Sequence, residues 1–173
     1  MANPPFNVNK IDKKKDYVIN DPRLPFGLPK NDNGNYMWIQ YFHSYLNEKG
    51  KAGFVMASSA TDAGGSEKII RQQLLETGDV EAIVSVGNNF FYTRSLPCHI
   101  WFLNKNKQDK NTVLMIEARN TFRKVNSTIN DFSQDQLEGL TTIIKSYRGE
   151  QVDFTANEWL TKTFKSGGYE DVD

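Results

Sequence analysis

The segment Asn3-Pro4-Pro5-Phe6 restricts the backbone of this chain more than any other stretch. Two consecutive prolines fix φ near about −65° and remove two backbone N–H donors, so a strand that ends here cannot extend its ladder. The residue before each proline is held extended. We therefore expect a strand that breaks into a rigid corner, with the Asn3 amide, the Pro4 carbonyl and the Phe6 ring in one frame. Such a corner offers two acceptors for the hydrogens of a planar amino group and an aromatic face for the ring that carries it.

Composition excludes several classes of protein. The 173 residues carry 21 basic and 21 acidic side chains, and this balance argues against a domain whose main task is to grip phosphate backbones. The single cysteine, Cys98, excludes an internal disulfide, and the two histidines, His43 and His99, show no zinc-ligand spacing. We expect His43 to be structural. No apolar run approaches about 18 residues and no signal-peptide pattern is present, so we expect a cytoplasmic protein without metal or membrane contact.

Four apolar stretches predict strands, at residues 52–57, 80–86, 98–103 and 113–118. Helical periodicity predicts one helix over 35–49, stopped by Gly50, and another from a Ser66 cap to Thr77. Strands separated by helices indicate parallel βαβ units. No helix is expected between 86 and 98, so the 98–103 strand is predicted to run antiparallel.

The remaining segments divide into loop and helix. Prolines and Asn-Gly make residues 7–34 a long loop. Two capping-box patterns, Ser133-x-x-Gln136 and Thr155-x-x-Glu158, predict helices in the last part of the chain. Residues 165–173 are expected to form a frayed acidic tail.

Three features in order resemble a known family: Asn3-Pro4-Pro5-Phe6, the strand within Lys51–Met56, and the segment Asn89-Phe-Phe-Tyr-Thr-Arg-Ser-Leu-Pro97 with the strand that follows it. Together they resemble the methylation subunit of type I restriction-modification systems, an adenine-N6 DNA methyltransferase. The segment Ala57-Ser58-Ser59-Ala60 departs from the family, which usually has Pro-Asn/Asp-Gly there, and no Gly-x-Gly cofactor turn occurs in the sequence.

The resemblance implies an α/β fold: the C-terminal half of a Rossmann-like, S-adenosylmethionine-dependent methyltransferase sheet, with parallel strands plus one antiparallel strand, followed by a short helical tail. Residues 1–120 would be a partial catalytic domain and residues 121–173 a C-terminal helical region. The implied cofactor is S-adenosylmethionine, and the implied partners are DNA and the specificity and restriction subunits of the same system. Because the glycine-rich turn is missing, we expect a fragment that is inactive alone and binds no cofactor, and its cofactor-binding residues cannot be assigned.

The same resemblance assigns the site. Adenine must leave the duplex to be methylated. Asn3 and the Pro4 carbonyl would accept the N6 hydrogens, Pro5 and Phe6 would complete the catalytic motif, and Phe6 would stack on the base. Phe91 is expected on the opposite face of the base, and Phe90 is expected to anchor the 87–97 loop in the core.

Geometry makes this assignment testable. If the 52–57 and 80–86 strands are parallel, the 87–97 loop leaves from the sheet edge at which Asn3 ends its strand. A base between two rings needs roughly 7 Å, from about 3.5 Å of contact distance on each face. Since the loop is free to relax, we expect the Phe6 and Phe91 side chains within about 15 Å of one another, a distance a few extended residues span.

Two other functions remain open. One is a related amino-methyltransferase that acts on RNA bases or on protein glutamine, which shares an Asn-Pro-Pro-aromatic motif. The other is a non-catalytic module that binds a protein partner without any cofactor, an interpretation that the missing glycine turn favours.

Overall fold

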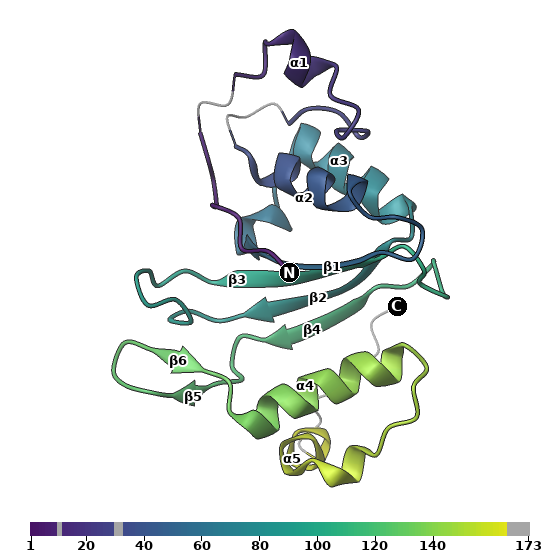
Figure 1. Ribbon diagram of the computed structural model, residues 1–173. Coiled ribbons are helices and arrows are strands. Elements are labelled where there is room, and N and C mark those ends of the chain that lie inside the picture. The colour runs from purple at the N-terminus through teal and green to yellow at the C-terminus, as the bar shows by residue number, and fades with distance from the viewer. Residues whose placement is uncertain (10–11, 30–32, 166–173) are drawn as a thin grey trace.

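A four-stranded sheet in the order β1-β3-β2-β4 forms the centre of the molecule (Figure 1). The computed structural model describes residues 1–9, 12–29 and 33–165. The strands are β1 (Lys51–Ala57), β2 (Val80–Val86), β3 (Cys98–Asn104) and β4 (Leu114–Ala118). β3 is antiparallel to both β1 and β2, and β4 is parallel to β2. The four predicted strands are therefore confirmed, and so is the antiparallel direction predicted for one of them, β3.

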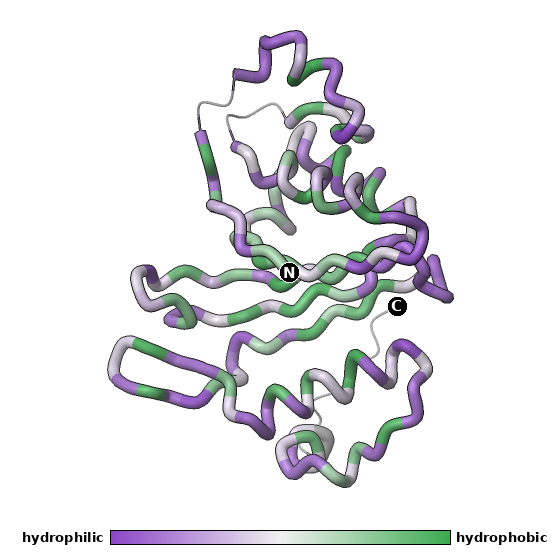
Figure 2. The backbone as a smooth tube through the Cα atoms, viewed as in Figure 1, coloured by the Kyte–Doolittle hydropathy of each residue, from purple (hydrophilic) through white to green (hydrophobic). Residues whose placement is uncertain are grey.

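Both faces of this sheet are apolar, which explains why helices cover both. Successive residues of a strand point to opposite faces. Phe54 and Trp101 pack in a cluster with α2 (Asn35–Ser44) and α3 (Ser66–Glu76), whereas Val84 and Cys98 pack with Leu140 of α4 (Gln134–Tyr147). Figure 2 shows hydrophobic segments along the strands, and hydrophobic residues that alternate with hydrophilic ones along these helices. The result is a helix–sheet–helix sandwich, with α5 (Glu158–Lys165) packed against α4.

Residues next to the helix ends determine where α4 begins and where α3 and α4 end. Ser133 and Gln136 form the predicted capping box: the Gln136 N–H donates to Ser133 Oγ at 3.2 Å, and the Ser133 N–H donates to Gln136 Oε1 at 2.9 Å. Gly149 follows α4 with φ +79°, and Gly78 follows α3 with φ +69°. Glycine adopts this left-handed conformation without steric cost, and both helices stop there.

Several predicted boundaries are wrong. The helix over 35–49 ends at Ser44, and Gly50 instead belongs to a tight turn in which its N–H donates to the Asn47 carbonyl at 2.8 Å. Ser66 is the first residue of α3 rather than its cap, since Gly65, with φ +64°, occupies the capping position. The loop 7–34 contains one helical turn, α1 (Asp16–Ile19), which tertiary packing stabilises because Val18 is buried.

The region 121–173, predicted as a C-terminal helical region, is not entirely helical. A short hairpin, β5 (Arg123–Lys124) and β6 (Asn130–Asp131), precedes α4. Two 3₁₀ turns, Ser58–Ala60 and Phe154–Ala156, complete the described elements. The cap of α5 is Asn157, whose Oδ1 accepts from the Leu160 N–H at 2.8 Å, so the predicted capping box at Thr155 is wrong. Residues 166–173, most of the predicted tail, lie outside the described residues.

Candidate active site

The Asn-Pro-Pro-Phe corner begins at the outer edge of β1. The Ala2 N–H donates to the Gly53 carbonyl at 2.9 Å, and the Ala2 carbonyl accepts from the Val55 N–H at 3.1 Å, which makes a parallel bridge. Pro4 cannot donate, so this pairing stops directly after Ala2. Asn3 is exposed while Pro4 is buried. The corner is thus held by the sheet on one side, and it presents the Asn3 amide to solvent at the carboxyl ends of the parallel strands.

A second attachment fixes the corner to the start of α2. Asn7 has φ +52°, a left-handed conformation that asparagine tolerates better than most residues. Its N–H donates to Asn35 Oδ1 at 2.9 Å, and Asn35 Nδ2 donates back to Asn7 Oδ1 at 2.8 Å. Sequence reasoning missed both asparagines. The available signal was a polar residue directly after the rigid Phe6, facing the asparagine-rich segment that precedes the helix.

The 87–97 loop meets this corner through an aromatic pair. The ring centroids of Phe6 and Phe91 are 5.9 Å apart, with an interplanar angle of 78°. The expectation that the two side chains lie within 15 Å is therefore correct, although the rings touch edge to face instead of enclosing a space. Tyr92, the next residue, is 88% exposed. Phe90 packs on Phe132 with a centroid distance of 4.7 Å, as expected for the anchor of the loop.

A hollow of about 430 Å³ with a mixed lining lies between the segment that follows β1 and the starts of α2 and α3. Its lining includes Asn35, Ser59, Asp62 and Glu67. Ser59 belongs to the segment 57–60 that departs from the family pattern. Asn35 also bonds Asn7, so the hollow shares a wall residue with the contacts that fix the corner.

The titratable groups near this sheet edge do not form a nucleophilic or metal centre. Cys98 is buried at the start of β3, and burial raises the pKa of its thiol to about 11, so the thiol stays protonated. Burial also lowers the pKa of His99, with a smaller contribution from the Arg119 charge in the same direction. Within the described part of the chain, no three His, Cys, Asp or Glu side chains gather where they could hold a metal ion.

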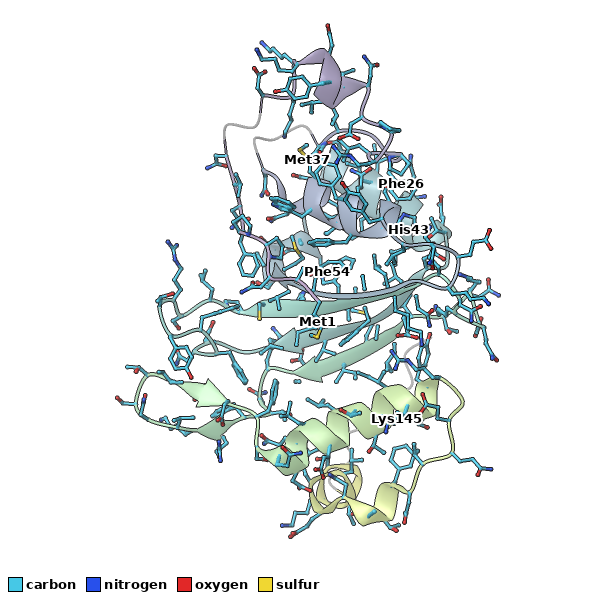
Figure 3. The ribbon with its side chains drawn as sticks, in the orientation of Figure 1. Met1, Phe26, Met37, His43, Phe54 and Lys145 are labelled. Atoms are coloured by element: carbon cyan, nitrogen blue, oxygen red, sulfur yellow. The ribbon has the colours of Figure 1, made fainter. Side chains whose placement is uncertain are left out.

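His43 lies at the opposite end of the sheet, and its environment agrees with the structural role predicted for it. Its Nε2 is 2.8 Å from Asp79 Oδ2, and Asp79 also pairs with Lys110 at 2.7 Å. The Phe26 ring covers the imidazole at a centroid distance of 5.4 Å, and Figure 3 labels both side chains. Burial lowers the pKa of His43, so the imidazole is neutral at pH 7.

The comparisons with known proteins place the chain in a class. Residues 1–165 match the family of N-6 DNA methylases, and the chain belongs to this family. Its relatives include the methylase subunit of the type I restriction enzyme MjaIX of Methanocaldococcus jannaschii, 35% identical over 165 residues. The methylase subunit of the type I restriction enzyme HindI of Haemophilus influenzae is 31% identical over 174 residues. These alignments cover 91% and 99% of this chain but 29% and 35% of the relatives.

A solved structure agrees with the fold. The methyltransferase subunit of a type I restriction-modification system from Streptococcus thermophilus superposes with a TM-score of 0.76 at 24% identity, over 88% of this chain and 32% of the other. The chain thus spans about a third of the length of the proteins it matches. Along the described residues, no helix is long and apolar enough to cross a membrane.

Proposed function

We propose that this chain provides the base-holding side of an adenine-N6 DNA methyltransferase, as part of the methylase subunit of a type I restriction-modification enzyme. Asn3 Oδ1 and the Pro4 carbonyl accept the two N6 hydrogens of a flipped adenine. This bonding localises the lone pair on the nitrogen, which makes the amino group available as a nucleophile. Phe6 and Phe91 hold the two faces of the base.

The observation that carries the proposal is the contact between Phe6 and Phe91. These residues are 85 positions apart in the sequence, yet their rings meet, and Phe6 follows the exposed Asn3 by three residues. Two aromatic faces beside two hydrogen-bond acceptors match what a flipped base requires, because such a base is read by stacking and by bonds to its edge. Catalysis by this corner is positioning with preorganised dipoles, and it needs neither a nucleophile nor a metal.

The rings must rearrange to accept a base. Parallel stacking on both faces needs about 7 Å between the rings, whereas the centroids are 5.9 Å apart at 78°. Rotation of Phe91 with a small outward movement of its loop opens this space. The loop is exposed over residues 92–96, so this movement displaces little packed structure.

S-adenosylmethionine is the methyl donor of this family, and it supplies an electrophilic methyl group. The residues of this chain do not fit a complete site for it, since the sequence contains no Gly-x-Gly turn. On the proposed function, DNA and the specificity and restriction subunits are the partners of the whole enzyme. Calorimetry on the 173-residue chain alone should show no S-adenosylmethionine binding at micromolar concentrations, and a clear 1:1 isotherm would contradict this division of the site.

The function is tested in a chimera in which residues 1–165 replace the matching region of the M. jannaschii relative. The assay follows transfer of a labelled methyl group to DNA and identifies the methylated base. We expect N6-methyladenine, and Asn3→Ala should reduce the rate about 10²–10³-fold, the usual effect of removing one preorganised polar group. Asn106→Ala, an exposed asparagine after β3, is the matched control. Product on another atom, or full activity of Asn3→Ala, would overturn the proposal.

A further inference from the structure

The β5–β6 hairpin is a small element between β4 and α4. Asn126 closes its turn, because Asn126 Oδ1 accepts from the backbone N–H groups of Thr128 and Ile129, each at 2.9 Å. Across the strands, Arg123 forms two hydrogen bonds with Asp131, at 2.9 and 2.6 Å. Two residues per strand are too few to be stable alone. The hairpin is therefore held by its surroundings as well as by these bonds.

Asn130 of β6 connects the hairpin to the base of the 87–97 loop. Its backbone N–H donates to the Asn89 carbonyl at 2.8 Å, and its Nδ2 donates to the Asn88 carbonyl at 3.1 Å. One residue thus binds two successive carbonyls of the loop. Asn89 has φ +69°, which turns the chain sharply just before the two phenylalanines. A residue other than glycine in this conformation costs free energy and persists where its surroundings fix it.

The residues that follow Asn130 in the chain and Asn89 in the loop extend the contact between the hairpin and the 87–97 loop. Phe132, two positions after Asn130, packs on Phe90. Phe91 then reaches Phe6. Immediately after Phe132, Ser133 caps α4, and α4 is anchored to the sheet through Leu140. The position of Phe91 therefore depends on a continuous series of contacts that leads back to the sheet.

We propose that Asn130 is a positioning residue for the proposed base site: through its two bonds it fixes the 87–97 loop so that Phe91 stands opposite Phe6. The inference rests on the proposed function for its catalytic meaning. The hairpin is the support of the loop, and the region after β4 contributes to the site without touching the base. The alternative is a hairpin that covers the sheet end while the loop is held by its Phe90 anchor alone. The proposal and this alternative make different predictions: Phe91 shifts when the Asn130 side chain is changed under the proposal, and it stays in place under the alternative.

The test uses the 173-residue chain with Asn130→Ala, Asn130→Asp and the control Asn106→Ala. Asn130→Asp keeps the shape of the side chain but replaces the Nδ2 donor by an oxygen that cannot bond the Asn88 carbonyl. The readout is the NMR cross-peak between the Phe6 and Phe91 rings, with the Phe90–Phe132 cross-peak as an internal reference. A second readout is the rate of tryptic cleavage after Arg94 in the loop.

We expect both Asn130 variants to weaken the Phe6–Phe91 cross-peak at least threefold relative to the reference. Cleavage after Arg94 should rise about fivefold, the factor by which one ordinary hydrogen bond changes an opening equilibrium. Asn106→Ala should change neither. An unchanged ring contact in a folded Asn130→Asp protein would overturn the proposal, as would equal loss of both cross-peaks, which indicates general unfolding. Neither readout requires methyl transfer, so failure of this inference is distinct from failure of the proposed function.

Discussion

Replacing Gly139 with alanine sets helix propensity against packing inside α4. Gly139 lies in the middle of this helix and is buried against α5. An added Cβ would lie 2.4 Å from Trp159 Cε3, 2.7 Å from Trp159 Cζ3 and 3.1 Å from Asn157 Oδ1. The Trp159 backbone is fixed as well, because its N–H donates to Asp135 Oδ2 at 2.8 Å. The indole therefore has to move by about 1 Å before the methyl group fits.

The relative sizes of the propensity gain and the packing cost decide whether Gly139→Ala raises or lowers the free energy of unfolding. Alanine in a helix interior is favoured over glycine by about 1 kcal/mol. Overpacking a well-filled site costs about 1–3 kcal/mol. We expect Gly139→Ala to lower the free energy of unfolding by about 1 kcal/mol, with a fall in Tm of about 2–4 °C for a chain of this length. Propensity alone predicts a rise of similar size, so the direction of the shift separates the two effects.

Thermal unfolding followed by circular dichroism measures this shift. Gly64→Ala is the matched control: nothing lies within 4 Å of its added Cβ and its φ is not positive, so a gain of about 0.4–1 kcal/mol is expected from the unfolded state. In a Trp159→Leu background the two closest contacts of the added Cβ, both with the indole, are removed, and Gly139→Ala should destabilise the protein less than it does in the wild-type background. A higher Tm for Gly139→Ala in the wild-type background would refute the packing argument.

Three further predictions concern charged and reactive groups. Arg148→Met should lower the free energy of unfolding, measured in urea, by about 3–5 kcal/mol. The reason is that Glu81, which is 1% exposed, loses the guanidinium that pairs with it at 2.6 Å. A loss below about 1 kcal/mol would contradict this. Burial lowers the pKa of His43 and of His99 in the folded protein, so the unfolded chain binds protons first below pH 6.5, and stability should fall on acidification from pH 7 to 5. His43→Gln should reduce that slope, and urea midpoints that rise with falling pH would refute the reasoning. The Cys98 thiol, with a pKa of about 11, should not react with an aromatic disulfide reagent at pH 7.5 until urea unfolds the protein; prompt reaction of the native state would show that it is accessible.

The sheet could be predicted because its signals are local and strong. Strands such as Val80–Val86 are rich in valine and other apolar residues, and the absence of a helix before Cys98 sufficed to predict an antiparallel strand. The meeting of Phe6 and Phe91 followed from strand order and chain reach. The Ser133 capping box was predictable because its two partners are three residues apart and bond one another directly.

The missed features depend on partners that are distant in the sequence. Thr155 and Asn157 are both plausible caps by residue type. Asn157 caps α5 because Asp135, on α4, accepts from both Asn157 Nδ2 and the Trp159 N–H, each at 2.8 Å. Nothing within residues 153–160 contains that information. The same holds for Asn7 with Asn35 and for the hairpin residue Asn130, whose partners lie 28 and 42 positions away.

The closed contact between Phe6 and Phe91 is compatible with a base site, on energetic grounds. An edge-to-face aromatic pair contributes about 0.5–1.5 kcal/mol beyond burial, and a base stacked on an aromatic side chain contributes about 1–3 kcal/mol. On the proposed function, entry of a base would exchange one ring–ring contact for two ring–base contacts, so the exchange would be favourable or neutral before the proposed edge bonds to Asn3 and Pro4 form. The Asn3 corner is held on both sides, by the backbone bonds of Ala2 to β1 and by the bond of Asn7 to Asn35. We infer that Phe91 is the moving part, and that the position of its loop sets how much of the stacking energy the site retains.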